Sequence, residues 1–501
     1  MGIAHREENF IVIELGSHTT KAVLDTSDIN KLPDVVLRTR GGVLKQDASN
    51  SAPQSATDEE FGGLKGEDSK QEPRSSGIAN TQDAAASTTP LHVNGIMDVD
   101  PAESTQRSSL QAETEDEVSS VGNAAAEAAA AGDSGADRSQ KDAEQDGNEV
   151  SYVFGSALES ATSDALESTV DMMVGGFVQD WEALSAFLRH IITKELGIPI
   201  SRNGSPILFS IPALWSKTDL ERLAQVAFEH LNAPTIVIAE QPLAALYGNG
   251  KMNGLVVDIG HTVTTITPVV DSCIQPSTIV QSPVAGAAVT RRLHELLEAD
   301  PSVNAQFDSG AVPLEFAERL KESGLCRLRL ALTGDEEDGD EQESASPPEF
   351  EYEGKKFRIN TEILAKAPEV LVEPTEPGTM RLTSLMQQAA LACDPEKRTA
   401  LWENINIVGG SSRFGSLKEY LQSELEATVL PASNMFAVSQ TREIKILSVP
   451  DYFVGWRNHD HWAGFLGACI MAKIIMNDAK HNITRAEYNE NGPSIVHTKP
   501  S

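Results

Sequence analysis

Apolar positions along this chain follow two periods, one typical of strands and one typical of helices. The runs at 10–15 and 254–259 are each followed by a glycine turn and a second β-branched run, so each predicts a β-hairpin. Other short apolar runs predict single strands, at 206–211, 235–239 and 404–408. Apolar residues at helical spacing predict helices, chiefly at 181–196, 216–231, 240–247 and 382–393. This alternation of strands and helices predicts an α/β fold.

Side chains that accept backbone hydrogen bonds predict where three helices begin. Asp180 is expected to be the N-cap of the first. Thr218 and Glu221 have the spacing of a capping box in the second. Ser416 and Glu419 have the same spacing at the start of the third, which follows the strand at 404–408.

Both predicted hairpins carry an acidic residue at the end of the first strand, beside the glycine turn. Glu14 precedes Gly16 in one hairpin, and Asp258 precedes Gly260 in the other. A carboxylate in this place can orient a hydrated metal ion while N–H groups of the turn bind a phosphate. Gly260 is expected to supply the positive φ of its turn. One such hairpin would be an ordinary structural element, but two copies about 240 residues apart predict two related domains that face a shared cleft.

Two acidic stretches interrupt the pattern. Residues 46–149 hold 22 acidic residues and six Lys/Arg without apolar periodicity, which predicts a disordered acidic insertion. Residues 335–350 hold eight acidic residues and no basic one, which predicts a disordered acidic loop at 334–349. A solvated loop without function and an interaction tail are both open for the longer stretch. The formal net charge of −34 argues against direct nucleic-acid binding, which needs clustered Lys/Arg.

Length and cysteine usage limit the class of protein. A chain of 501 residues is too long for one core and indicates two or more domains. The four cysteines are far apart and form no C-x-x-C pair, so we expect reduced thiols and no zinc site. The first residues have no apolar signal core, and no apolar run is long enough to cross a bilayer. We therefore expect a soluble, intracellular protein without membrane contact.

Three glycine-rich elements and the C-terminal segment together resemble the actin branch of the actin, Hsp70 and hexokinase superfamily. The third element is the Gly409-Gly410 turn, which follows a strand and precedes a helix, where free N–H groups can meet an anion. The segment 487–497, Glu-Tyr-Asn-Glu-Asn-Gly-Pro-Ser-Ile-Val-His, resembles the actin C-terminus almost residue for residue. The segment 239–247 resembles the one that carries the water-positioning glutamine of actin. The resemblance covers nearly everything outside the two acidic stretches and implies an actin-like two-domain fold around a nucleotide cleft.

The same resemblance implies domain boundaries. It places the outer domain at 1–45 and 150–248 around the insertion 46–149, the inner domain at 249–446, and a return to the outer domain with an actin-like tail at 447–501. Within the actins, the motifs at 258–261, 401–410, 450–456 and 465–467 resemble fungal nuclear actin-related proteins of class nine. That class is implied to sit in chromatin-remodelling complexes of the SWI/SNF and RSC type. There it pairs with a second actin-related protein on a long helix of the motor subunit.

Matching positions assign a nucleotide site by resemblance. The expected cofactor-binding residues are Gly16, Ser17, Lys21, Asp258, Gly260, Lys321, Glu322, Gly409, Gly410 and Phe414. Gln241 matches the water-positioning glutamine, and Glu14 stands where actin has a metal-orienting aspartate. ATP or ADP held as a structural ligand is one alternative, and an empty cleft without cofactor or metal is the one that we favour.

Several positions depart from actin in ways that oppose catalysis. His18 replaces a turn glycine, His261 an aspartate, Thr262 a glycine, and Thr265 a histidine near the attacking water. An imidazole obstructs the approach of a phosphate, and loss of an acid weakens metal orientation, so we expect Gln241, Asp258 and Glu14 to be degenerate counterparts of catalytic residues. Protonated His18 and His261 pairing with phosphate is the weaker alternative.

We therefore expect a non-catalytic structural subunit of a remodelling complex. A helix of the motor subunit is expected to bind in a groove near the tail at 488–497, together with the second actin-related protein and other subunits of the complex. Nuclear placement follows from the resemblance alone. The alternatives are a nucleotide-binding actin-like ATPase or cytoskeletal filament former, and a sugar kinase of the same superfamily. The acidic insertion interrupts the loop through which actin subunits bind one another, which argues against filaments.

Overall fold

The computed structural model describes residues 6–45, 150–162, 165–308, 310–329, 347–432, 441 and 443–499. These belong to one unit of the chain, residues 1–47 with 148–501, and only this unit is described below. The predicted insertion at 46–149 and most of the predicted acidic loop at 334–349 lie outside the described residues. In the described part of the chain, no helix is long and apolar enough to cross a membrane.

The first hairpin is the middle of a six-stranded sheet with the order β18-β10-β9-β1-β2-β3. The strands are β1 (Ile11–Glu14), β2 (Thr19–Leu24), β3 (Val35–Arg38), β9 (Ile207–Ile211), β10 (Thr235–Glu240) and β18 (Ile483–Thr484). Strand β1 pairs antiparallel with β2 and parallel with β9. The prediction of a hairpin at the N-terminus is therefore confirmed.

The second hairpin lies in a five-stranded sheet with the order β13-β12-β11-β17, in which β14 also pairs with β12. The strands are β11 (Gly254–Ile259), β12 (Thr264–Val270), β13 (Cys273–Ile274), β14 (Val280–Ser282) and β17 (Ile405–Val408). Strand β11 pairs antiparallel with β12 and parallel with β17. The first strand of each hairpin, β1 or β11, therefore has one antiparallel and one parallel neighbour.

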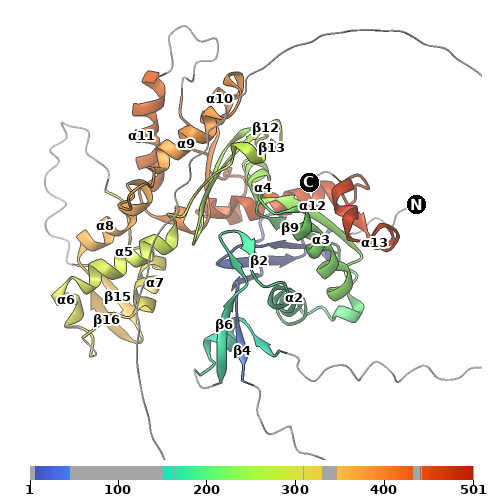
Figure 1. Cartoon of the computed structure of the whole chain (residues 1–501), viewed down its shortest axis with the longest axis horizontal. Coiled ribbons are helices and arrows are strands. Elements are labelled where there is room, and N and C mark those ends of the chain that lie inside the picture. Colours follow the sequence, from blue (N-terminus) through green and yellow to red (C-terminus); the bar gives the residue numbers. More distant parts are fainter. Residues whose placement is uncertain are drawn as a thin grey trace, which may run out of the picture. The chain divides into compact units, whose positions relative to one another are not determined.

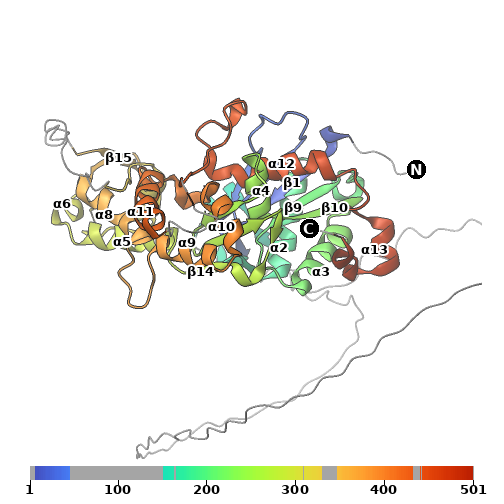
Figure 2. The same cartoon turned by 90° about the horizontal axis from the view of Figure 1, so that it is seen from above.

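Helices cover both faces of the six-stranded sheet. Figure 2 shows α4 (Gln241–Gly248) and α12 (Ala463–Ile475) on one face and α2 (Trp181–His190) and α3 (Lys217–Gln225) on the other. Successive residues of β1 point to opposite faces: Ile11 and Ile13 belong to the apolar cluster beneath α2 and α3, and Val12 to the cluster around α4 and α12. Burial on both faces explains why this strand has a continuous apolar run rather than an alternating one.

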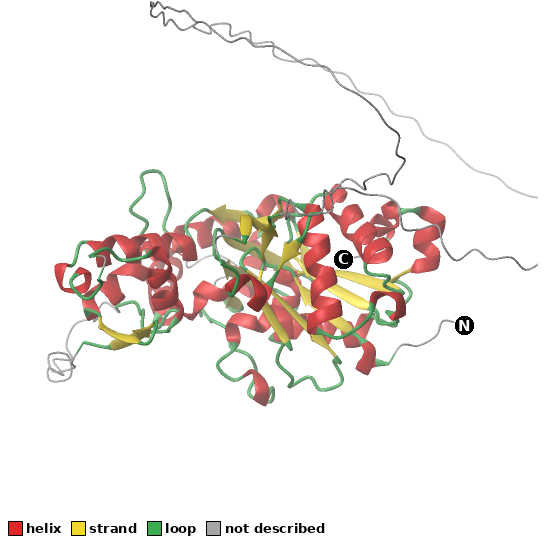
Figure 3. Ribbon diagram, turned by 90° about the horizontal axis from the view of Figure 1, so that it is seen from below, coloured by secondary structure: helices red, strands yellow, loops and turns green. Residues whose placement is uncertain are grey.

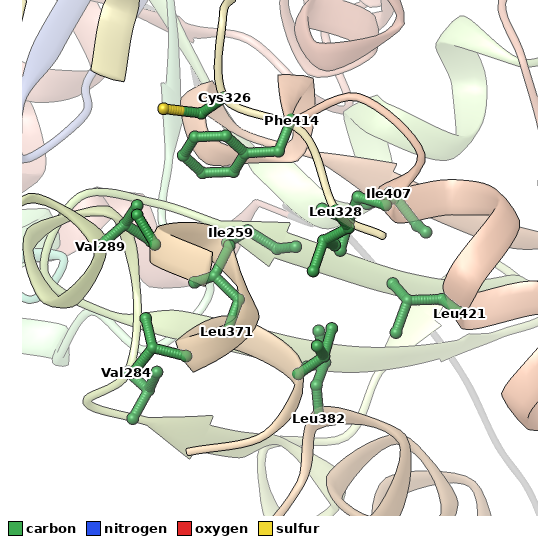
Figure 4. Packing of buried hydrophobic residues seen from close by; sticks show 14 of the residues in the cluster. Ile259, Val284, Val289, Cys326, Leu328, Leu371, Leu382, Ile407, Phe414 and Leu421 are labelled. Carbon is green, nitrogen blue, oxygen red and sulfur yellow. The ribbon is translucent and has the colours of Figure 1, made fainter. Parts of the chain in front are cut away.

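A larger group of helices packs on the five-stranded sheet and beyond it (Figures 1 and 3). These helices are α5 (Gly286–Glu298), α6 (Pro301–Asn304), α7 (Leu314–Glu322), α8 (Thr361–Val372), α9 (Leu382–Leu391), α10 (Pro395–Trp402) and α11 (Leu417–Ala432). The hairpin of β15 (Glu349–Tyr352) and β16 (Lys355–Arg358) adjoins α7. Figure 4 shows the apolar cluster that joins this group to β11 and β17 through Ile259 and Ile407.

The remaining strands and α-helices are short. They are β4 (Arg40–Leu44), β5 (Tyr152–Val153), α1 (Gly155–Glu159), β6 (Leu166–Asp171), β7 (Met173–Val174), β8 (Phe177–Val178) and α13 (Arg485–Asn491). Strands β5, β4 and β6 form a small sheet, and β7 and β8 form a hairpin. Helices α2 and α3 each continue as a π-helical turn, Ile191–Glu195 and Val226–His230, so that both predicted helices reach nearly their expected ends.

The observed starts of the helices confirm one of the three predicted caps and show that the other two are wrong. Asp180 is the N-cap of α2, as predicted, and its carboxylate accepts from the N–H groups of residues 182 and 183. The capping box of α3 is formed by Ser216 and Asp219 rather than by Thr218 and Glu221, because the helix begins two residues earlier than that pair requires. Ser416 has a φ of 61° and shares no hydrogen bond with Glu419 among the described residues, so the third predicted box is wrong.

Candidate functional site

The turns of the two hairpins border a common cavity of about 520 Å³. Such a volume is ordinary for a small-molecule site. All the sequence-predicted site residues line it: Glu14, Gly16, Ser17, Lys21, Gln241, Asp258, Gly260, Lys321, Glu322, Gly409, Gly410 and Phe414. The structure thus brings together residues from four distant parts of the chain, 14–21, 241–260, 321–322 and 409–414.

Glycine is needed in the two hairpin turns for space and not for a left-handed backbone. Neither Gly16 nor Gly260 has a positive φ, so the prediction for Gly260 is wrong. A Cβ atom on Gly16 would lie 2.5 Å from the carbonyl oxygen of Thr19, and one on Gly260 would lie 2.9 Å from that of Val263. A side chain at either position would therefore force the turn apart.

Gly409 joins the late turn to the second hairpin. It has a φ of 91°, and a Cβ atom there would collide with the carboxylate of Asp258. Its N–H donates to the carbonyl oxygen of His461 at 3.2 Å. Glycine is therefore required here by both backbone conformation and close packing.

Lys21 is already paired within the cavity. Its ammonium donates to the carboxylate of Glu14, its cross-strand partner in the β1–β2 hairpin. The two side chains are only 10% and 12% exposed, and the ammonium also lies 5.9 Å from the centroid of the Trp462 ring. The charge that would attract a phosphate is therefore opposed by an adjacent carboxylate.

Among the residues that the structure describes, no cation forms an ion pair with Asp258. Burial, and then the nearby Glu14 carboxylate, raise the pKa of its carboxyl to about 6 against the opposing effect of Lys21. The Asp258 carboxylate is consequently costly to keep ionised at neutral pH.

Gln241 is held by the six-stranded sheet. Its Nε2 donates to the carbonyl oxygen of Leu15 at 2.7 Å and to that of Ser210 at 3.3 Å. These carbonyl groups lie at the ends of β1 and β9. The amide nitrogen of Gln241 is therefore engaged with the backbone.

The imidazole rings of His18 and His261 stack on each other, with centroids 4.2 Å apart and planes inclined by 24°. Nε2 of His18 lies 3.6 Å from Oε1 of Glu322, which also accepts from Nη2 of Arg38 at 3.2 Å. Burial lowers the pKa of His261 to about 3, and the neighbouring His18, Lys321 and Arg38 act in the same direction. The His18 ring, followed by Arg38, lowers the pKa of Glu322 to about 2 against the opposing effect of burial.

The hydroxyl groups of both hairpin turns are also engaged. Ser17 Oγ accepts from the N–H of Gly176 at 2.8 Å, and Thr262 Oγ1 accepts from the N–H of Gly175 at 3.0 Å. Both donors belong to the turn between β7 and β8. That one turn therefore contacts both hairpins.

The other predicted cofactor-binding residues, Lys321, Glu322 and Phe414, have different surroundings. Lys321 Nζ donates to Thr290 Oγ1 at 2.8 Å, whereas its neighbour Glu322 faces His18 and Arg38. Figure 4 shows Phe414 and Cys326 at the border of the apolar cluster, and both also line the cavity. Among the described residues, no group of three or more His, Cys, Asp or Glu side chains could hold a metal ion.

Sequence reasoning missed Arg38, His461, Trp462 and the turn at 175–176. The run His-Asp-His-Trp before α12 was the available signal for His461 and Trp462. Arg38 had no local signal, since its partner Glu322 is 284 positions away.

Comparisons with known proteins agree with the geometry. The family model described as Actin matches residues 5–309 and 336–501. "Actin-like protein 9" of Mus musculus is 29% identical over 365 residues, which cover 72% of this chain and 80% of that protein. "SWI/SNF and RSC complexes subunit arp9" of Schizosaccharomyces pombe is 27% identical over 418 residues, covering 67% of this chain and 80% of that protein. "Actin-related protein 7" of Oryza sativa subsp. japonica is 28% identical over 345 residues, covering 67% and 87%.

Proposed function

We propose that this chain, which belongs to the actin family, is a non-catalytic structural subunit of a chromatin-remodelling complex of the SWI/SNF or RSC type. Its similarity to the arp9 subunit of Schizosaccharomyces pombe supports the kind of complex. The cleft, in this proposal, is retained because it builds the fold and not because it hydrolyses ATP.

The observation that carries the non-catalytic part is the pairing of Lys21 with Glu14. Phosphoryl transfer depends on positioned charges that stabilise the transferring group. A lysine already opposed by a buried carboxylate supplies little of that stabilisation.

The partner proposal concerns the C-terminal tail. Tyr488 donates its hydroxyl proton to Glu229 at 2.7 Å, and His497 Nε2 lies 2.9 Å from a carboxylate oxygen of Glu221. These contacts fix the tail against α3 and its continuation, so that it presents a defined surface. We propose that a helix of the motor subunit binds near this tail, beside a second actin-related protein and other subunits of the complex. The proposed location is the nucleus, without direct nucleic-acid contact, in keeping with the net charge of −34.

The second candidate is a nucleotide-binding actin-like ATPase or a cytoskeletal actin-related protein. One observation favours it: every predicted nucleotide position lines the same cavity of about 520 Å³. ATP or ADP bound as a structural ligand without hydrolysis would fit this observation equally well.

Purification of the tagged full-length chain from its own cells, with identification of the co-purifying chains, tests the proposed partners. The expected result is a motor subunit together with a second actin-related protein, and a fluorescent tag is expected in the nucleus. Recovery of the chain alone or in filaments would contradict the proposal. ATP turnover with Mg²⁺ is measured alongside for the wild type and Gln241→Ala. Turnover at the rate of actin that is abolished by Gln241→Ala would overturn the non-catalytic assignment.

A further inference from the structure

Direct side-chain contacts cross the cleft between the two lobes, one built on the six-stranded sheet and one on the five-stranded sheet. His18 lies in the β1–β2 turn of the first lobe, and His261 lies in the β11–β12 turn of the second. Their rings stack at a centroid distance of 4.2 Å. The two turns that border the cavity are thus joined to each other by protein atoms.

A charged contact lies beside the stack. Glu322, at the end of α7 in the second lobe, accepts from Arg38 Nη2 of β3 in the first lobe at 3.2 Å, and Arg38 Nη1 lies 3.9 Å from Glu318. The side chains of Arg38 and Glu322 are 36% and 41% exposed. Ion pairs this exposed contribute little individually. Their importance here is that Glu322 also lies 3.6 Å from Nε2 of His18, so that it connects the ion pairs with the stacked rings.

A hydrogen bond between the lobes completes the set. The N–H of Gly175, in the β7–β8 turn of the first lobe, donates to Thr262 Oγ1 in the second at 3.0 Å. The same β7–β8 turn is tied to the first hairpin through Gly176 and Ser17. Separation of the lobes would therefore break the ring stack, the ion pairs and this hydrogen bond together.

We propose that His18, His261, Thr262, Glu322 and Arg38 form a clasp that holds the two lobes closed without a nucleotide. Both hairpin turns line the cavity, and the two imidazole rings bridge them directly. The clasp rests on the proposed non-catalytic function, and it explains how the lobes keep one relative position for a partner in the absence of bound ATP.

Charged side chains surround the two stacked rings. The groups that face His18 and His261 are Glu322, Arg38 and Lys321. Burial, Lys321 and Arg38 disfavour a positive charge on the His261 ring, and Glu322 opposes them.

Hydrogen exchange of the full-length chain, freed of nucleotide by apyrase and EDTA, tests the clasp. In the double variant His18→Ala/His261→Ala, exchange in the segments 15–19, 174–177 and 259–263 is expected to rise on the order of tenfold. The matched control is His190→Ala, which removes a histidine that pairs with Glu195 at 3.2 Å inside one lobe. This control is expected to leave exchange in the three segments unchanged.

A surface variant keeps the test decisive if the double variant does not fold. Arg38→Gln/Glu322→Gln alters only partly exposed side chains and is expected to raise exchange in the same segments by about threefold. Unchanged exchange in this variant would overturn the clasp. So would a wild-type chain in which addition of Mg-ATP or Mg-ADP slows exchange in these segments tenfold, because the ligand would then be what closes the cleft. Partner co-purification does not depend on these results, so failure of the clasp and failure of the proposed function are distinguishable.

Discussion

Helix α12 crosses α4 at Gly467 and Ala244, so closely that a Cβ atom on Gly467 would overlap the carbonyl oxygen of Ala244. The apolar cluster around this crossing includes Val12 of the six-stranded sheet and Val256 of the five-stranded sheet. The crossing of the two helices therefore lies where both lobes share a core.

Gly467→Ala is expected to destabilise the protein by about 3 kcal/mol, because the colliding atom belongs to the backbone of a packed helix and cannot rotate away. The measurement is the free energy of unfolding in urea. Gly204→Ala is the matched control: Gly204 is exposed, and a Cβ atom there meets nothing within 4 Å. Equal stability of the two variants would show that the crossing is looser than described.

Asp258→Asn is expected to stabilise the protein at pH 7.5 by about 1–3 kcal/mol. The folded-state pKa of Asp258 is raised to about 6, above its ordinary value of 3.8. A raised pKa contributes stability that is present below pH 3.8 and is lost as the pH rises through 6, so the ionised carboxylate is a cost at neutral pH. The gain from asparagine is therefore expected to shrink between pH 7.5 and pH 5. Thermal unfolding at several pH values checks this, with Asp308→Asn at an exposed position as the control. A loss of stability at pH 7.5 would contradict the prediction.

The histidine stack is expected to make folding sensitive to acid. The pKa of His261 is lowered to about 3 in the folded state, from its ordinary value of 6.5. The unfolded chain therefore takes up a proton at this residue below pH 6.5 while the folded chain does not. This difference lowers stability as the pH falls from 6.5 towards 3, by at most about 1 kcal/mol per pH unit for a partly exposed ring. The measurement is the difference in unfolding free energy between wild type and His261→Asn at pH 7.5 and pH 5.5. A difference that is the same at both pH values would rule the effect out.

The start of α3 offers a direct comparison of two neighbouring residues. Ser216→Ala is expected to cost about 1 kcal/mol, since Ser216 Oγ accepts from the N–H of Asp219 and the Asp219 carboxylate accepts in return. Thr218→Ala is expected to change stability by less than about 0.5 kcal/mol. Urea unfolding of both variants decides whether the box lies at 216 or, as the sequence spacing indicates, at 218.

Local sequence was sufficient for the main elements of the fold. The two hairpins were predictable because an apolar strand, a turn and a β-branched strand form within about 15 residues, where few alternatives compete. The gathering of Glu14, Asp258 and Gly409 at one cavity was predictable once the hairpins were matched to actin, since strand ends that carry matching residues meet at the same cleft. Asp180 was predictable because an N-cap depends only on the residues beside it.

What each cleft residue contacts depended on the packing of the whole chain. Arg38 meets Glu322 across 284 positions, and no periodicity indicates such a pair. The spacing rule misplaced the box of α3 because two overlapping pairs satisfy it, and the path of the chain into the helix selects one. Sequence thus determined many of the chemical groups that line the cleft, although Arg38, His461 and Trp462 were missed. Only the tertiary structure decided that Lys21 pairs with Glu14 and His18 stacks on His261, because a side chain's partner is set by which segments the folded core brings within a few ångströms.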